Sequence, residues 1–117
     1  MTKFQKGMKG QLEAENFLRS KNYRIIERNY RIRTGEIDLI AEDNGYVVFI
    51  EVKYRKGLDL GFPAESVTYY KQQKIIKTAL FYIANKKLIN RDYRFDVLEV
   101  LEMDEITINH IENAFWA

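Results

Sequence analysis

The segment GEIDLIAEDNGYVVFIEVKYR, residues 35–55, contains two apolar runs that are separated by a short polar stretch around Asn44 and Gly45. Asn-Gly between two such runs is the strongest short-range indication of a β-hairpin. With Asn44 and Gly45 at the centre of the turn, the numbers of opposed residues sum to 89. A four-residue loop keeps this register, whereas a three-residue loop would shift it.

Charged residues interrupt both runs of this hairpin, although charged side chains avoid protein interiors unless they are paired, bound to metal or needed for chemistry. Side chains alternate between the two faces of a strand. In the predicted register Asp38 faces Glu51, and Glu36 faces Lys53. One interpretation is a cross-strand ion pair between Glu36 and Lys53, with both remaining carboxylates in solvent.

The second interpretation of these charges is a metal site. Directly opposed Cβ atoms lie about 4.5–5.5 Å apart, where like charges such as Asp38 and Glu51 destabilise a sheet. A divalent cation such as Mg²⁺ or Mn²⁺ would offset this repulsion, because it prefers oxygen ligands and leaves positions for water and a substrate phosphate. Lys53 could then steer or deprotonate a water that attacks phosphorus. The hairpin thus has the parts of a metal-dependent phosphodiesterase.

The rest of the chain predicts a single α/β domain over residues 1–117. Apolar residues at spacings of three and four indicate helices, and β-branched and aromatic runs indicate strands. The first helix precedes a strand and the hairpin, and a crossover helix leads back to the sheet, which gives the order αβββαββ and a mixed sheet flanked by helices. The expected elements outside the hairpin are a helix over 3–21, a strand over 23–33, a helix from Pro63 to about Leu88, and strands over 93–101 and 105–115.

Composition places this chain among soluble globular proteins, since 46% of its 117 residues are hydrophobic and 31% are charged. Its longest apolar run, residues 79–84, is far too short to span a bilayer, and the N-terminus lacks the apolar region of a secretory signal. We therefore expect a cytoplasmic protein with no membrane partner. The absence of cysteine excludes disulfides and thiolate-bound zinc.

The charge of the chain is divided unevenly along its length. Residues 1–94 contain all 19 Lys and Arg and 11 of the 17 acidic residues, a net charge of +8, whereas the last 23 residues carry −6. A basic body suggests a polyanionic partner such as nucleic acid, because Lys and Arg gain affinity by releasing counterions from phosphates. The alternative is a solubilising surface that binds nothing.

Several blocks of the sequence resemble one known family. The PD-(D/E)xK nuclease signature is matched by Asp38, which is followed after twelve residues by Glu-x-Lys. The YraN-like family of small bacterial proteins is resembled by three blocks together, namely GEIDLI, FIEVKYR and RFDVLEV. GMKGQLEAENFL, YRIIERNYR and HIENAF extend the resemblance over nearly the whole chain. The family is regarded as a group of endonucleases related in fold to archaeal Holliday-junction resolvases. The resemblance therefore implies a restriction-endonuclease-like fold.

The resemblance also implies roles for individual residues. It makes Asp38 and Glu51 ligands of Mg²⁺, adds the Val52 carbonyl as a further ligand, and makes Lys53 the catalytic lysine. Glu36 belongs to the same block and would orient Lys53 or a metal-bound water. Such proteins commonly carry Glu directly after the second glycine of the first helix, where this chain has Gln11. That departure puts metal affinity and activity in doubt.

Basic and aromatic residues near the hairpin are candidates for contacts to nucleic acid. Arg55 and Lys56 lead from the second strand into a Gly-rich loop that could clamp a strand of nucleic acid. Lys71 interrupts the apolar stripe of the second helix, where it could point into the site or snorkel at the edge of the stripe, and Lys74 lies beside it. Three tyrosines could stack on bases or fill the core, namely Tyr30, Tyr69 and Tyr70.

The sequence thus predicts metal-dependent cleavage of phosphodiester bonds in nucleic acid, with DNA as the expected partner. The alternative is a nucleic-acid-binding module that keeps the fold but lacks activity. A third hypothesis is a protein-interaction adaptor that uses the acidic C-terminus and Trp116. A role in cutting junctions would favour a two-fold dimer.

Overall fold

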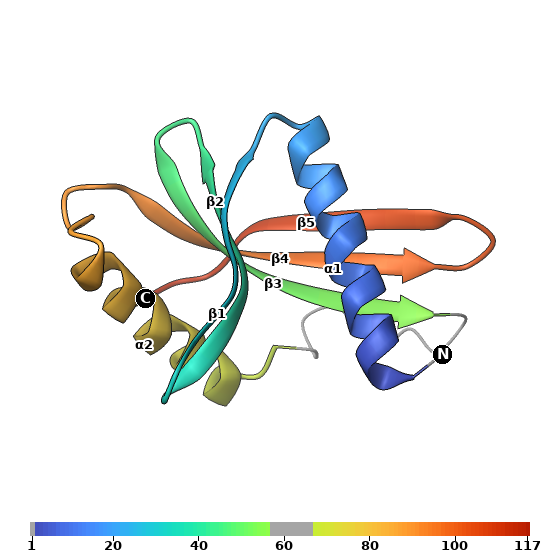
Figure 1. Cartoon of the computed structure of the whole chain (residues 1–117), viewed down its shortest axis with the longest axis horizontal. Helices are drawn as coiled ribbons and strands as arrows, with labels where there is room; N and C mark the ends of the chain where they lie inside the picture. Colours follow the sequence, from blue (N-terminus) through green and yellow to red (C-terminus); the bar gives the residue numbers. More distant parts are fainter. Residues whose placement is uncertain (1, 57–66) are drawn as a thin grey trace.

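The structure is a computed structural model that describes residues 2–56 and 67–117. Its elements follow the predicted order αβββαββ and form an α/β fold with two helices and a mixed sheet (Figure 1). They are α1 (Lys3–Ser20), β1 (Arg24–Ile32), β2 (Gly35–Asp43), β3 (Tyr46–Lys56), α2 (Tyr69–Asn85), β4 (Tyr93–Glu102) and β5 (Ile106–Phe115).

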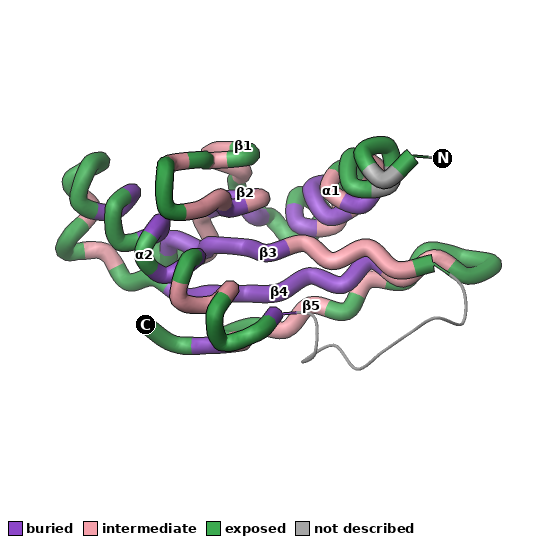
Figure 2. The backbone as a smooth tube through the Cα atoms, turned by 90° about the horizontal axis from the view of Figure 1, so that it is seen from below, coloured by how far each residue is buried: buried purple, intermediate pink, exposed green. Residues whose placement is uncertain are grey.

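The sheet has five strands in the order β1-β2-β3-β4-β5. β3 and β4 are parallel, and the other neighbouring strands are antiparallel. A parallel pair needs a crossover connection, and α2 lies in that connection. The centre of a sheet with helices on both faces is buried on both sides. Figure 2 accordingly shows long buried stretches along β3 and β4.

Two hydrophobic clusters hold the helices against opposite faces of the sheet. The α2 cluster joins Ile75 and Ala79 of that helix to Phe49 and Phe95 of the central strands. The α1 cluster joins residues of α1 to the residues of β2, β3 and β4 that point to the other face of the sheet. Its buried members are Ala14, Leu18, Tyr23, Leu39, Ala41, Val48, Ile50, Leu98 and Val100. The alternation of β3 and β4 therefore assigns each side chain to one helix.

The hairpin between β2 and β3 has the predicted turn. Asn44 and Gly45 both adopt positive φ angles, of 48° and 88°, as a two-residue type I′ turn requires. The paired residues run from Asp43 opposite Tyr46 to Leu39 opposite Ile50, and their numbers sum to 89 as predicted.

β2 and β3 separate beyond Leu39, which the sequence did not predict. β2 stays paired with β1 as far as Gly35, whereas β3 stays paired with β4 as far as Lys56. Asp38 lies at the point of separation. Ile37 belongs to the α2 cluster and Leu39 to the α1 cluster, although alternate residues of a regular strand share a face. The ladder between β2 and β3 therefore ends before the predicted pair of Asp38 with Glu51.

α2 begins at Tyr69, later than the predicted start at Pro63, which lies outside the described residues. Thr68 is its N-cap, and the Thr68 hydroxyl accepts a hydrogen bond from the Lys71 amide at 3.2 Å. Such a cap satisfies one of the free amides of the first turn.

No helix within residues 2–56 and 67–117 combines the length and the apolar character that crossing a bilayer requires.

Candidate functional site

Charged side chains from three elements meet where β2 and β3 separate. Glu51 and Lys53 are two residues apart on β3 and share the face that α2 covers. Lys71 reaches them from the first turn of α2, and Asp38 reaches them from β2. The structure thus brings together four residues that the sequence singled out, three as metal or catalytic residues and Lys71 as a nucleic-acid contact that could point into the site. We call Asp38, Glu51, Lys53 and Lys71 the charged cluster.

Direct contacts fix the positions of both carboxylates in the charged cluster. Asp38 Oδ2 accepts a hydrogen bond from the Val52 amide at 2.8 Å. The irregular backbone at Asp38 thus places this side chain against β3, beyond the last residue pair of the hairpin. Lys71 Nζ lies 3.3 Å from Glu51 Oε1, and the Glu51 side chain is only 8% exposed. The contact seen for Val52 is made by its amide, whereas the sequence analysis expected its carbonyl to bind metal.

The environment of Glu51 opposes its negative charge. Burial raises the pKa of Glu51 to about 7, and repulsion by Asp38 acts in the same direction. Lys71 and Lys53 favour the charged form but do not outweigh these two effects. A carboxyl group with a pKa near neutrality carries a proton for part of the time at physiological pH.

The two lysines of the charged cluster have opposite pKa shifts. Burial, together with the adjacent Lys71, lowers the pKa of Lys53 to about 8. Burial acts to lower the pKa of Lys71 too, but its hydrogen bond to Lys53 and the charge of Glu51 raise it instead. Lys53 is therefore the lysine that loses its proton first. Two titratable neighbours whose pKa values are pushed apart are typical of an acid–base site.

Glu36 lies outside the charged cluster, so its predicted pairing with Lys53 is wrong. Glu36 is the cross-strand partner of Arg31 on β1, and Arg31 Nη2 donates to Glu36 Oε2 at 3.2 Å. Asn29 Nδ2 donates to the other Glu36 oxygen at 3.1 Å, and Gln11 Nε2 donates to Asn29 Oδ1 at 2.9 Å. The reason is the separation of the strands, because β2 has left β3 before it reaches Glu36. This geometry gives no support to a role for Glu36 in orienting Lys53.

Glu99 is a buried carboxylate beside the charged cluster that the sequence analysis missed. It is the Cα partner of Lys53 in the parallel ladder and is 2% exposed. Asn109 Nδ2 donates to Glu99 Oε1 at 3.0 Å, and Arg55 Nε lies 3.8 Å from Glu99 Oε2. Arg55, predicted to grip phosphate, therefore has a carboxylate partner within the protein. The register of a parallel pair depends on a long crossover, so the sequence carries no local pattern for this contact.

The other predicted basic residues lie on the surface around the charged cluster. Lys56 ends β3 and is exposed. Lys74 is exposed on α2, one turn after Tyr70, and its Nζ lies 4.8 Å from the centre of the Tyr70 ring. The Lys71 side chain is 41% exposed, so its stem is partly packed while its ammonium group contacts Glu51. Lys71 thus points into the charged cluster rather than only snorkelling past it.

The donor set of the charged cluster fits a hard divalent cation. Mg²⁺ is commonly held by one or two carboxylates together with water and substrate phosphate, rather than by a complete protein cage. Asp38 and Glu51 provide two such carboxylates. In residues 2–56 and 67–117, no group of three or more His, Cys, Asp and Glu side chains gathers in a way that could hold a metal ion. The charged cluster thus suits a cation that keeps open positions.

Comparison with known proteins identifies the family. The model of the uncharacterised protein family UPF0102 matches residues 11–100. A UPF0102 protein of Clostridioides difficile is 45% identical over 115 residues, which cover 98% of this chain and 100% of that protein. The chain belongs to the UPF0102 family. A UPF0102 protein of Persephonella marina is 44% identical over 110 residues, covering 94% of this chain and 92% of the relative. The predicted membership of the YraN-like family, which is UPF0102, is confirmed.

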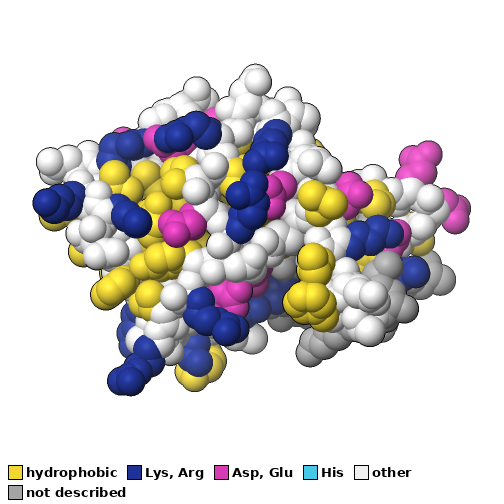
Figure 3. Space-filling model, viewed as in Figure 1, with side chains coloured by type: hydrophobic (Ala, Val, Ile, Leu, Met, Phe, Trp, Pro, Cys, Tyr) yellow, Lys and Arg dark blue, Asp and Glu magenta, His cyan; other side chains and the backbone are white. Residues whose placement is uncertain are grey.

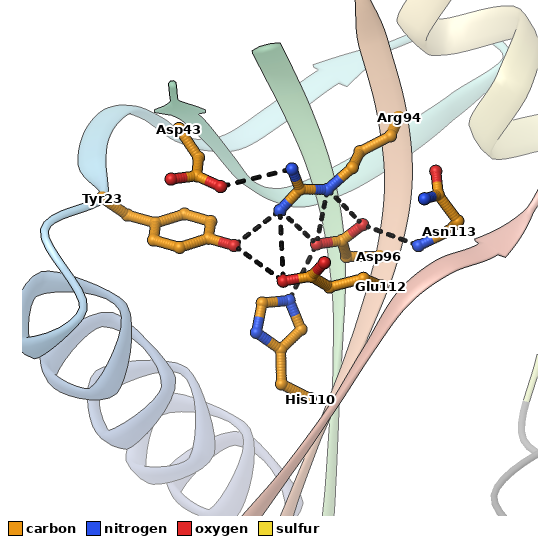
Figure 4. Close-up of polar contacts among 7 residues, drawn as sticks. All are labelled: Tyr23, Asp43, Arg94, Asp96, His110, Glu112 and Asn113. Carbon is orange, nitrogen blue, oxygen red and sulfur yellow. Dashed lines mark hydrogen bonds and ion pairs between the residues drawn. The ribbon is translucent and has the colours of Figure 1, made fainter. Parts of the chain in front are cut away.

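This UPF0102 chain also contains a buried polar network on the α1 face of the sheet (Figure 4). Its centre is Asp96, which is fully buried and receives Arg94 Nε at 3.1 Å and the Asn113 amide at 3.1 Å. His110 Nε2 lies 2.7 Å from the other Asp96 oxygen. Burial acts to raise the pKa of Asp96, but the hydrogen bonds from His110 and Arg94 lower it. Apart from His110 Nδ1, which is buried without a hydrogen-bond partner among the described residues, these groups pair with one another beneath α1, so we assign the network to stability.

Proposed function

We propose that this UPF0102 protein is a metal-dependent endonuclease that hydrolyses phosphodiester bonds in DNA. The observation that carries the proposal is the buried Glu51 carboxylate, which is held beside Asp38 in surroundings that raise its pKa to about 7. Strongly shifted pKa values that arise from burial together with a charged neighbour are concentrated at functional sites.

The charged cluster is unfavourable for the fold alone. Burying Glu51 beside a second carboxylate costs free energy, and an ion pair with Lys71 recovers only part of it. A neutral side chain of similar size would fill the same space without this cost. A chain that nevertheless places these charges together gains something other than stability from them, and binding of a cation is the gain that fits two adjacent carboxylates.

The proposed chemistry divides the work between the carboxylates and the lysines. Asp38 and Glu51 would hold Mg²⁺ or Mn²⁺, which when bound stabilises the negative charge that develops on the phosphate. Lys53, with its pKa of about 8, is suited to accept a proton from the water that attacks phosphorus. Lys71 keeps its proton more firmly and provides a fixed positive charge beside the reacting group.

A nucleic-acid substrate is favoured by the positive charges that surround the cluster. The exposed Lys56 and Lys74 and the partly exposed Lys71 lie on the elements that form the site. Such side chains bind phosphates without regard to base sequence. The same surface would hold the nucleic acid on either side of the scissile bond.

A second candidate function is a nucleic-acid-binding module without activity. Two observations favour it: the Lys71 ammonium already neutralises part of the Glu51 charge, and Gln11 is hydrogen-bonded to Asn29 rather than supplying the carboxylate that the resemblance implied. Metal-dependent turnover separates the two functions, because only the first requires it.

The test is cleavage of labelled single-stranded, duplex, flap and four-way-junction DNA with Mg²⁺ or Mn²⁺. The wild-type protein is compared with Asp38→Asn, Glu51→Gln and a matched control, Glu105→Gln, which removes an exposed carboxylate from the turn between β4 and β5. The proposal expects cutting that needs metal, disappears in the two site variants and persists in the control. DNA binding without cutting by any of these proteins would favour the inactive module.

A further inference from the structure

Tyr70 is an aromatic side chain that the fold leaves in solvent next to the charged cluster. It precedes Lys71 on α2 and is 70% exposed. Tyr30, another candidate for base stacking, instead packs edge-on against Tyr82 in the α2 cluster, with ring centres 5.0 Å apart. The two interpretations of the tyrosines, core and base contact, therefore apply to different residues, and Tyr30 belongs to the core.

The Lys74 ammonium group lies over the Tyr70 ring. Lys74 lies one helical turn further along α2, on the same flank, and its Nζ is 4.8 Å from the ring centre. This cation–π contact occupies one face of the ring, and most of the Tyr70 surface remains exposed. Tyr69 is equally exposed, at 75%, but its side chain points about 100° further around the helix.

The flank of α2 that carries Tyr70 and Lys74 faces the turn between β1 and β2. Gly35, where β2 begins, packs closely against α2. A Cβ atom added at Gly35 would lie only 3.3 Å from the Lys74 carbonyl oxygen and 2.8 Å from Thr78 Oγ1. Arg33 is exposed in this turn. Figure 3 shows Lys and Arg side chains gathered at the lower left, over the turn and the adjoining part of α2. An aromatic ring thus stands beside Lys74 on the helix that also carries Lys71 of the charged cluster.

We propose that Tyr70 is a stacking platform for an unpaired base of the nucleic acid that binds at the charged cluster, with Lys74 and Arg33 contacting the adjacent phosphates. The inference rests on the proposed function and deepens it by naming the substrate class. Aromatic rings interleaved with cations are the pattern by which proteins hold single strands. Bases of a continuous duplex are already stacked and paired, so an exposed ring gains this contact only from unpaired bases. The substrates would be single strands, flaps or junctions with unpaired bases.

The experiment measures DNA binding by fluorescence anisotropy in EDTA, at one fixed salt concentration, so that no cleavage occurs. The probes are a labelled single strand of about 20 nucleotides and the duplex of the same sequence, because a strand of this length covers the site of one small domain. The proteins are wild type, Tyr70→Ala, Tyr70→Trp and the matched control Tyr69→Ala. Both alanine variants change exposed residues, and thermal unfolding checks that they remain folded.

We expect Tyr70→Ala to weaken binding of the single strand by about 5-fold to 100-fold while duplex binding changes less than about twofold. Tyr70→Trp and Tyr69→Ala should bind the single strand as the wild type does. Equal losses for both probes, equal losses in Tyr69→Ala, or no loss at all would overturn the inference. Wild-type protein that binds no single strand would overturn it too. Because the assay contains no metal, each of these results is independent of whether the protein cuts DNA.

Discussion

Replacing Glu51 by Gln should stabilise the protein, and the gain should grow with pH. Gln keeps the shape of the side chain but removes the charge that burial and Asp38 oppose. A carboxyl group whose pKa is raised in the folded state costs no stability below its unfolded pKa of about 4.5, and stability is lost as pH rises from that value to the folded pKa of about 7. The free-energy cost of ionising Glu51 in the folded protein is therefore complete above about pH 7.

The pKa of about 7 sets the size of the effect. With an unfolded pKa of 4.5, the ionisation of Glu51 costs about 1 kcal/mol of folding free energy at pH 5 and about 3 kcal/mol at pH 8. The advantage of Glu51→Gln over wild type should therefore be about 2 kcal/mol larger at pH 8 than at pH 5. A Glu51 kept for an ion pair with Lys71 would behave oppositely, because its loss would leave a partly buried ammonium unpaired.

Urea unfolding at both pH values, in EDTA, measures this difference. Glu105→Gln is the control, because its exposed carboxylate should give almost the same stability as wild type at both pH values. A Glu51→Gln protein that is less stable than wild type, or whose difference from wild type does not change with pH, would refute the reasoning that Glu51 is retained at the expense of stability.

Other consequences of the site and the fold can be measured separately. Lys71→Ala should reduce the slope of log affinity against log salt for DNA by about 1, as expected for one lost phosphate contact; an unchanged slope in an anisotropy titration would remove Lys71 from the binding surface. Any cleavage rate should rise between about pH 6 and pH 9 and then level, because Glu51 must be ionised and Lys53 neutral; a flat pH–rate profile would contradict these roles. Asp96→Asn should cost about 3–5 kcal/mol in urea unfolding because it leaves Arg94 without its main counter-charge, and replacing both residues by apolar ones should cost much less.

The hairpin could be predicted from sequence because its determinants are local. Asn44 and Gly45 fix the turn, and the alternation of the flanking strands fixes the register as far as Leu39 and Ile50. The same local pattern implies that the ladder continues to Asp38. The ladder does not continue, because β2 stays paired with β1 while β3 stays paired with β4. These pairings depend on contacts between distant segments of the chain.

The neighbours of a site residue could be predicted from the sequence only where local structure determines them. Glu51 and Lys53 share a face through strand alternation alone. Glu36 pairs with Arg31 because it follows β1 instead of β3. Glu99 lies beside Lys53 because of the register between parallel strands, which the sequence does not encode locally.

The buried network shows the same limit on the other face of the sheet. Arg94 and Asp96 lie two residues apart on β4, so strand alternation places both side chains on one face, where they form a contact. The contact between Asp96 and His110 joins separate strands under α1, so no spacing in the sequence reveals it.

Apolar side chains also remain exposed on α1, where Figure 3 shows hydrophobic groups near the N-terminal part of the helix. Phe4, Met8 and Leu12 follow one another at intervals of four residues, and each is at least 59% exposed. Such a stripe on a helix usually packs against another surface.

Binding of Mn²⁺ to the isolated protein tests most directly whether Asp38 and Glu51 form a metal site. Titration calorimetry above about pH 7, where Glu51 is largely ionised, should show one saturable site per chain in wild type and in Glu105→Gln. The same titration should show that this site is lost in Asp38→Asn and Glu51→Gln. Saturable binding that is equal in all four proteins would place the metal elsewhere, and absence of binding to the wild type would contradict a metal site at the charged cluster.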